Sequence, residues 1–204
     1  MLRLDHLAIS ASPLEQVVEA VEAALGTRLA PGGQHALMST HNKLLGLGDI
    51  YLEVIAIDPD APTPAHPRWF DLDHFSGRPR LTNWIVACDD LDAALAGLPP
   101  GVGVPHDLAR GDLRWRMAVP ADGKLPFRNA HPALIQWQGA AHPAQRLPDA
   151  GVRLELLEIA TPDAEALADT LRGRFADPRV QIISGPGVEL RARFSTPHGP
   201  RVIE

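Results

Sequence analysis

The chain has 204 residues, of which 45% are hydrophobic and 22% charged, with a formal net charge of −6. This acidic balance argues against a nucleic-acid partner, which requires a clustered basic face, and no apolar run approaches the roughly 18 residues of a membrane span. The single cysteine, Cys88, excludes an internal disulfide. We therefore expect a cytoplasmic protein with a small-molecule ligand and no membrane partner.

The first predicted element is a strand in "RLDHLAIS", residues 3–10. Alternation with a period of two places Leu4, His6 and Ala8 on one face and Leu7 and Ile9 on the other. A helix follows, because apolar residues recur at helical spacing after a Ser-Pro start. The helix must pack on one face of the sheet, and His6 is predicted to project from the opposite, concave face.

This strand-helix unit occurs three times. "LDHLAISASPLEQVVEAV" from Leu4 aligns without gaps with "LTNWIVACDDLDAALAGL" from Leu81 and "LELLEIATPDAEALADTL" from Leu154. Alternating segments separated by Gly and Pro follow each unit, as in "DLRWRMAV". The repeat is predicted to be a strand, a helix and about three further strands, written βαβββ.

The predicted domain of residues 1–140 contains two such modules, at 2–58 and 81–140. A Pro-rich connector at 59–80 joins them, and its Trp69 and Phe70 could cover a binding cup as a lid. The third repeat spans 150–204. A lone module leaves one sheet face uncovered, so the third repeat either packs on the first two or pairs with a second chain in a possible homodimer.

Four successive segments of the first module, "LDHLAI", "GGQH", "THNKLLGLG" and "YLEVI", resemble the vicinal oxygen chelate superfamily and its glyoxalase-like domain proteins. The resemblance covers residues 2–138 well and the third repeat more faintly. It implies an α+β fold in which tandem βαβββ modules form a half-open barrel around a shared cup. The third, partial βαβββ-like repeat would follow at the C-terminus.

The resemblance also implies a divalent metal, zinc, manganese, iron or nickel, held by the first and last strands of both modules. These strands supply His6 and Asn83, and then Glu53 and Gln136. We expect His6, Glu53 and Gln136 as metal ligands, and Asn83, whose amide binds metals weakly, as a substrate contact. The third repeat has Leu156 at the position of His6, so the fold itself requires no polar residue there.

The alternative is a polar floor without metal, in which the same four side chains form hydrogen bonds with a ligand. Both interpretations explain Glu53, because a carboxylate between apolar neighbours is costly to bury unless it is paired, protonated or coordinated. Trp137, which follows Gln136, is expected to face away from the cup.

Other polar residues complete the predicted site. His35 in "GGQH" is a candidate catalytic base beside Glu53, because its ordinary pKa is near neutral, and Asn42 is a candidate substrate contact. Arg114 and Arg116 share one strand face. They turn either into the cup, where they would bind an anionic substrate, or outward to solvent.

The resemblance implies a small-molecule enzyme with lyase, isomerase or dioxygenase chemistry on a substrate with vicinal oxygens. A metal at His6 and Glu53 would stabilise an enolate while a nearby base moves a proton. The competing hypothesis is a metal-free binding or sequestering protein that uses the same cup. The fold alone does not choose among these reactions.

Overall fold

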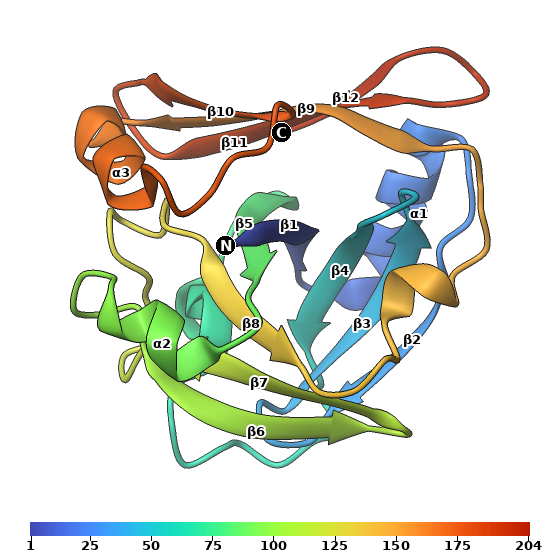
Figure 1. Cartoon of the computed structure of the whole chain (residues 1–204). Coiled ribbons are helices and arrows are strands. Elements are labelled where there is room, and N and C mark those ends of the chain that lie inside the picture. Colours follow the sequence, from blue (N-terminus) through green and yellow to red (C-terminus); the bar gives the residue numbers. More distant parts are fainter.

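The computed structural model describes residues 1–204, which form two β-sheets and three α-helices (Figure 1). The elements are β1 (Arg3–Ala11), α1 (Leu14–Leu25), β2 (Ala30–His35), β3 (Thr40–Gly46), β4 (Tyr51–Ile57), β5 (Arg80–Ala87), α2 (Leu91–Ala96), β6 (Val104–Arg110), β7 (Leu113–Val119), β8 (Ala133–Trp137), β9 (Arg153–Thr161), α3 (Ala164–Leu171), β10 (Val180–Ser184), β11 (Glu189–Ser195) and β12 (Arg201–Ile203), with short 3₁₀ segments at Trp69–His74 and Pro143–Gln145.

The larger sheet contains both predicted βαβββ modules. Its strand order is β2-β3-β4-β1-β5-β8-β7-β6, and in each module the first strand pairs in parallel with the last. The antiparallel pair β1–β5 joins the modules at the centre. The sheet curls around a concave face, here called the cup, and the predicted α+β half-barrel is confirmed (Figure 1).

The first strands of the two modules meet at equivalent residues, because Leu7 of β1 lies opposite Trp84 of β5. Both residues are fully buried in a large apolar cluster on the helix side of the sheet. Ala8 and Ile85 belong instead to a second cluster, which fills the cup. The predicted faces of Leu7, Ala8 and Ile9 agree with these clusters, whereas Leu4, expected on the face of His6, lies in the helix-side cluster.

A β-bulge interrupts the regular alternation near the start of β1. Leu4 pairs with Val86 and His6 with Ile85, so Asp5 is an extra residue without a partner on β5. A bulge re-aims the side chains beside it. Asp5 and His6, although consecutive in sequence, are both buried and form a hydrogen bond with each other.

The third repeat has the predicted order of elements but a different strand pairing. The smaller sheet runs β10-β9-β11-β12, so β9 pairs in parallel with β10, the strand that follows its helix. In the first two modules the parallel partner is the last strand. The last strand here, β12, has three residues and lies at the edge of the sheet.

The smaller sheet packs on the helix-bearing face of the larger sheet. Its Leu157, Ile159 and Phe194 are fully buried in the same cluster as Leu7 and Trp84. In Figure 1 this sheet, orange to red, lies across the larger one. The third repeat thus packs on the first two modules, and its pairing with a second chain stays a prediction.

The Pro-rich connector packs against the cup, as its position between the modules suggests. Trp69, Phe70 and Leu72 are buried in the cup cluster together with Ile55 and Ile85. The connector therefore covers part of the concave face with aromatic side chains.

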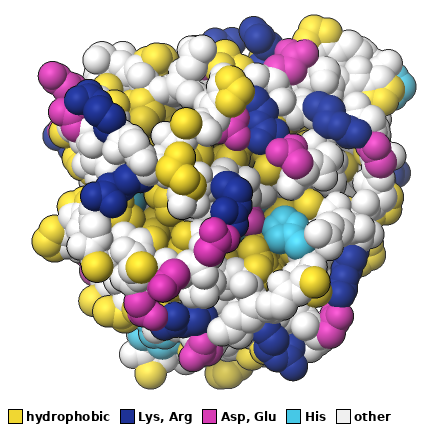
Figure 2. Space-filling model, viewed as in Figure 1, with side chains coloured by type: hydrophobic (Ala, Val, Ile, Leu, Met, Phe, Trp, Pro, Cys, Tyr) yellow, Lys and Arg dark blue, Asp and Glu magenta, His cyan; other side chains and the backbone are white.

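Charges of both signs are interspersed over the molecular face shown in Figure 2, and no large basic patch is seen on it. Several arginines form surface ion pairs, as in Arg3 with Asp89 and Arg146 with Asp112. None of the helices is long and apolar enough to cross a membrane.

Candidate functional site

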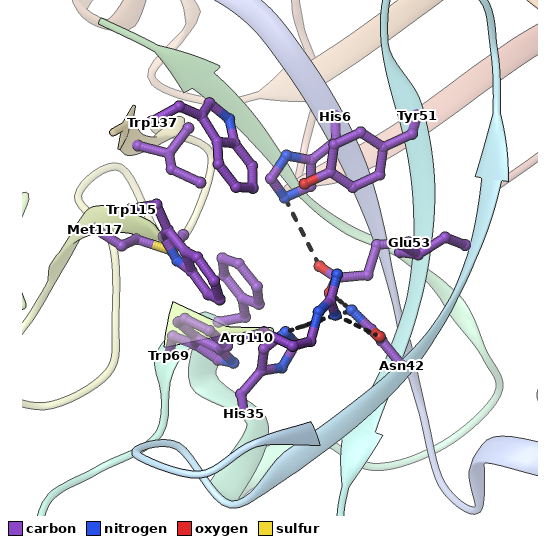
Figure 3. Close-up of a pocket in the computed structure, with 13 residues that line it drawn as sticks. His6, His35, Asn42, Tyr51, Glu53, Trp69, Arg110, Trp115, Met117 and Trp137 are labelled. Carbon is purple, nitrogen blue, oxygen red and sulfur yellow. Dashed lines mark hydrogen bonds and ion pairs between the residues drawn. The ribbon is translucent and has the colours of Figure 1, made fainter. Parts of the chain in front are cut away.

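A small cavity of about 30 Å³ lies in the cup and is lined by residues of both modules (Figure 3). A cavity of this volume holds about two water molecules. Eight of the 13 lining residues are apolar or aromatic, and the polar ones are His6, His35, Asn42, Glu53 and Arg110. The structure thus brings together four of the predicted site residues and adds Arg110.

The ring of His6 is held on two sides. Its Nδ1 donates to Asp5 Oδ1 at 2.6 Å, and the ring stacks on Tyr51 with centroids 4.4 Å apart and planes 12° apart. A carboxylate can only accept this bond, so Nδ1 carries a proton and Nε2 is the nitrogen turned toward Glu53. The distance from His6 Nε2 to Glu53 Oε2 is 3.7 Å.

Asp5 forms a carboxylate support behind His6. Its Oδ2 accepts from Trp137 Nε1 at 2.9 Å and from His142 Nε2 at 3.0 Å. Burial alone would raise the pKa of Asp5, but hydrogen bonds from His142 and His6 hold this pKa well below its ordinary value. An ionised carboxylate at this position orients the imidazole.

Glu53 lies on β4 beside Ala8 of β1 and is buried. Its Oε1 accepts from Asn42 Nδ2 at 2.5 Å. An acceptor carboxylate and an imidazole nitrogen 3.7 Å apart can act on neighbouring atoms of one substrate.

His35 is buried and its Nδ1 lies 3.0 Å from Thr40 Oγ1. Burial, followed by the nearby charge of Arg110, lowers the pKa of His35 to about 3. The imidazole is therefore neutral near pH 7 and a weak base. This environment favours a hydrogen-bonding role over the general-base role expected from the sequence.

Arg110, at the end of β6, was not found from the sequence. Its Nη1 lies 3.2 Å from Asn42 Oδ1 and 3.5 Å from His35 Nε2, and the guanidinium makes no ion pair. A Cβ atom on Gly33 would lie 2.5 Å from Arg110 Cδ, so the glycine makes room for this side chain. The pair of glycines in "GGQH" signals such a close approach, but not which residue approaches.

Asn83 lies on the cup side of β5 but does not line the cavity. Because β1 and β5 are antiparallel and Leu7 lies opposite Trp84, Asn83 pairs with Ala8, and His6 pairs with Ile85. Neither side-chain amide atom of Asn83 has a hydrogen-bond partner. The structure therefore does not bring Asn83 to His6.

Gln136 faces the outside of the sheet, contrary to the expectation from the sequence. Its Oε1 accepts from Leu91 N at 3.1 Å and its Nε2 donates to Asp89 O at 2.9 Å, at the start of α2. Trp137 takes the opposite orientation, lines the cavity and donates to Asp5.

Strand register explains why Gln136 does not reach the cavity. Glu53 pairs with Ala8, and the equivalent pair in the second module is Ala133 with Ile85. The position that corresponds to Glu53 is thus Ala133, three residues before Gln136. An odd offset along a strand changes the face, so the sequence comparison placed the wrong residue in the cup.

Arg114 and Arg116 turn outward, so the expectation that they contact substrate is not supported. Arg116 Nη1 donates to Asp92 at 2.7 Å, and Arg114 Nη1 donates to the carbonyl oxygen of Gly111 at 2.6 Å. Trp115, between them on β7, lines the cavity.

The residues present do not fit the metal site that the resemblance implies. His6 Nε2 and Glu53 Oε2 converge, but Gln136 and Asn83 point elsewhere. No group of three or more His, Cys, Asp or Glu side chains is arranged to hold a metal ion. Structural and catalytic zinc sites ordinarily use at least three protein ligands, which exceeds the two found here.

A family model described as "Glyoxalase-like domain" matches residues 4–174. The chain belongs to the glyoxalase-like domain family. This match and the fold confirm the resemblance to the vicinal oxygen chelate superfamily. Among curated proteins, no sequence match is found for this glyoxalase-like protein.

Solved structures extend the comparison of the fold. A hypothetical protein from Staphylococcus aureus has a TM-score of 0.62 and 13% identity, and the match covers 93% of this chain and 88% of that chain. A methylmalonyl-CoA epimerase from Streptomyces coelicolor has a TM-score of 0.45 and 17% identity over 68% and 98% of the two chains. The epimerase from Mycobacterium tuberculosis has a TM-score of 0.44 and 19% identity over 68% and 88%. At 13% identity, the match to the Staphylococcus aureus protein shows a shared fold only.

Proposed function

We propose that the protein is a vicinal-oxygen-chelate-type enzyme that moves a proton on the carbon beside a carbonyl group of a small molecule. Membership of the glyoxalase-like domain family supports the enzyme class. The observation that carries the reaction is the approach of His6 Nε2 to Glu53 Oε2, at 3.7 Å, inside a buried cavity. Isomerase and lyase reactions both begin with this proton transfer.

Glu53 is the base in this proposal. Its carboxylate, which accepts a hydrogen bond from Asn42, takes the proton from the substrate carbon, and the electron pair of the broken C–H bond moves into the carbon–carbon bond of an enol. The proposal requires His6 in its protonated form, in which Nδ1 donates to Asp5 and Nε2 donates its proton to the carbonyl oxygen. An isomerase would reverse both transfers at another position, whereas a lyase would expel a leaving group.

The surroundings suit such a step. Trp69, Phe70 and Trp115 form apolar walls of the cavity, and water is displaced when substrate enters. Charges interact more strongly in such an environment than in water. Ligand sites usually measure about 300–1,000 Å³, so we propose that Trp69 and Phe70 of the connector move aside to admit the substrate.

The test is hydrogen exchange in deuterated buffer. Small carbonyl compounds are incubated with the protein, and loss of the proton beside the carbonyl is followed by ¹H NMR. The wild type should exchange at least one compound, and Glu53→Gln and Asp5→Asn should slow the exchange by at least about 100-fold and 10-fold. Glu15→Gln, which changes an exposed glutamate on α1, is the matched control.

Two outcomes would contradict the proposal. Binding of compounds without any exchange would support the second candidate, a metal-free binding or sequestering protein. The structure favours that alternative to the extent that only two of the expected metal donors, His6 and Glu53, converge, which is too few to hold a metal ion. Stoichiometric metal in the purified protein, lost in both His6→Ala and Glu53→Ala, would support metal-assisted chemistry instead.

A further inference from the structure

Arg110 is a cation with unused hydrogen-bond donors in the candidate site. A guanidinium carries five N–H donors, yet Arg110 makes only the Nη1 contacts to Asn42 Oδ1 and, at 3.5 Å, to His35 Nε2. Other arginines have carboxylate partners. Arg116 of β7 pairs with Asp92, and Arg146, between β8 and β9, pairs with Asp112. A partly buried charge without a counter-ion is a site that a ligand anion can satisfy.

The surrounding structure is built to hold this guanidinium. Gly33 leaves space that any Cβ atom would close, since it would lie 2.5 Å from Arg110 Cδ. Asn42 Oδ1 accepts from both Gly33 N, at 2.8 Å, and Arg110 Nη1, at 3.2 Å. The other end of the same amide donates to Glu53, so Asn42 links the arginine to the proposed base.

The neighbours of Arg110 add no second positive charge. His35, with its pKa lowered to about 3 by burial, stays neutral and turns Nε2 toward the guanidinium. Trp69 and Trp115, which form edge contacts with the ring of His35, complete an apolar wall. In such surroundings an anion is attracted to a cation that faces the cavity more strongly than in water.

We propose that Arg110 binds the carboxylate of the substrate and that the substrate is therefore a small carboxylic acid. The inference rests on the proposed function and names its substrate class. A cavity of about 30 Å³ accepts a group of carboxylate size, and Arg–carboxylate pairs are commonly bidentate. As Glu53 removes the proton beside the carboxylate, negative charge develops on the substrate in the transition state until His6 donates its proton, and Arg110 stabilises that charge.

The test compares acetate with acetamide, which has the same shape without the charge. Binding to the full chain is followed by the fluorescence of Trp69 and Trp115. Acetate should bind at least tenfold more tightly than acetamide. Arg110→Met should remove this preference, and Arg110→Lys should keep part of it, whereas Arg146→Met, which alters an exposed arginine, should leave it unchanged.

Equal affinities for acetate and acetamide in the wild type would overturn the inference, and this comparison needs no variant to fold. An acetate preference that persists in folded Arg110→Met would also overturn it. The two proposals fail separately. Hydrogen exchange of neutral carbonyl compounds without an acetate preference would remove only the carboxylate site, whereas an acetate preference without exchange of any compound would remove only the proton-transfer function.

Discussion

Individual residues differ sharply between the two halves of the cup. The first half carries His6 and Glu53, whereas the equivalent positions of the second half carry Asn83 and Ala133. Asn83 and His131, on this second side, retain buried polar atoms without hydrogen-bond partners. The chemistry is therefore concentrated in one half of a pseudo-symmetric structure, and the other half has no carboxylate to act with.

His131 makes stability depend on pH. Burial lowers its pKa to about 4, so between pH 6.5 and 4 the unfolded chain binds a proton that the folded chain does not. The contribution of the neutral His131 ring to the free energy of unfolding is complete above pH 6.5. Between pH 6.5 and 4 this contribution falls by about 1.4 kcal/mol for each unit of decreasing pH. His131→Gln should flatten the dependence of unfolding free energy on pH in this range, measured by urea denaturation.

The control for this experiment is His198→Gln, which changes an exposed histidine. It should leave the slope between pH 6.5 and 4 unchanged. His35, whose pKa is lowered to about 3, also contributes below pH 6.5, so some slope should remain in His131→Gln. An unchanged slope in His131→Gln would show that the ring titrates normally in the folded protein.

At the scale of elements, β8 links the cup to a helix terminus. Alternation along the strand directs Ile135 and Trp137 into the cavity and Gln136 toward α2. The helix has six residues, and its N-terminus is capped by Asp90, which accepts from Ala93 N, as well as by Gln136. Such bonds satisfy backbone N–H groups that lack partners within the helix.

This placement predicts a structural effect for Gln136→Ala. Loss of the bonds to Leu91 N and Asp89 O should lower the free energy of unfolding by about 1 kcal/mol, as measured by urea denaturation, while proton exchange activity stays unchanged. Gln138→Ala, which removes a side chain without a hydrogen bond of its own, is the control. Loss of bound metal or of exchange in Gln136→Ala, with stability unchanged, would contradict the orientation described here.

For the molecule as a whole, the smaller sheet and the two modules share one apolar cluster. Leu157 of β9 and Trp84 of β5 are both fully buried in it. A shared core of this kind predicts cooperative unfolding, because the smaller sheet cannot separate without exposing the helix-side face of the larger one.

Leu157→Ala should therefore lower the unfolding free energy of the entire chain by about 2–5 kcal/mol. Far-UV circular dichroism and tryptophan fluorescence should follow the same single transition in urea. Ile183→Ala, on a partly exposed position of the same sheet, should change stability by less than about 1 kcal/mol. Two separate transitions, with only one shifted by Leu157→Ala, would show that the smaller sheet folds independently.

Much of the architecture could be predicted because the repeat and the alternation of apolar residues are local. Period-two alternation is sufficient to place Leu7 and Ile9 under the helix and to direct His6 and Glu53 into the cup. The hydrophobic spacing of the helices and the Pro-rich connector follow from the same short-range rules. The sequence alone therefore determined the module count, the faces of most residues of the first strand and four of the residues that line the cavity.

Other features depend on contacts between segments far apart in the chain. The register of β8 against β5 decided that Ala133, and not Gln136, corresponds to Glu53. The bulge at Asp5 turned two consecutive side chains toward each other, and the approach of β6 to Gly33 brought Arg110 to the cavity. A shift of one residue in register reverses every side chain of a strand, and only long-range packing sets that register. For this reason the tertiary structure, and not the sequence, decided which cation and which carboxylates surround His6.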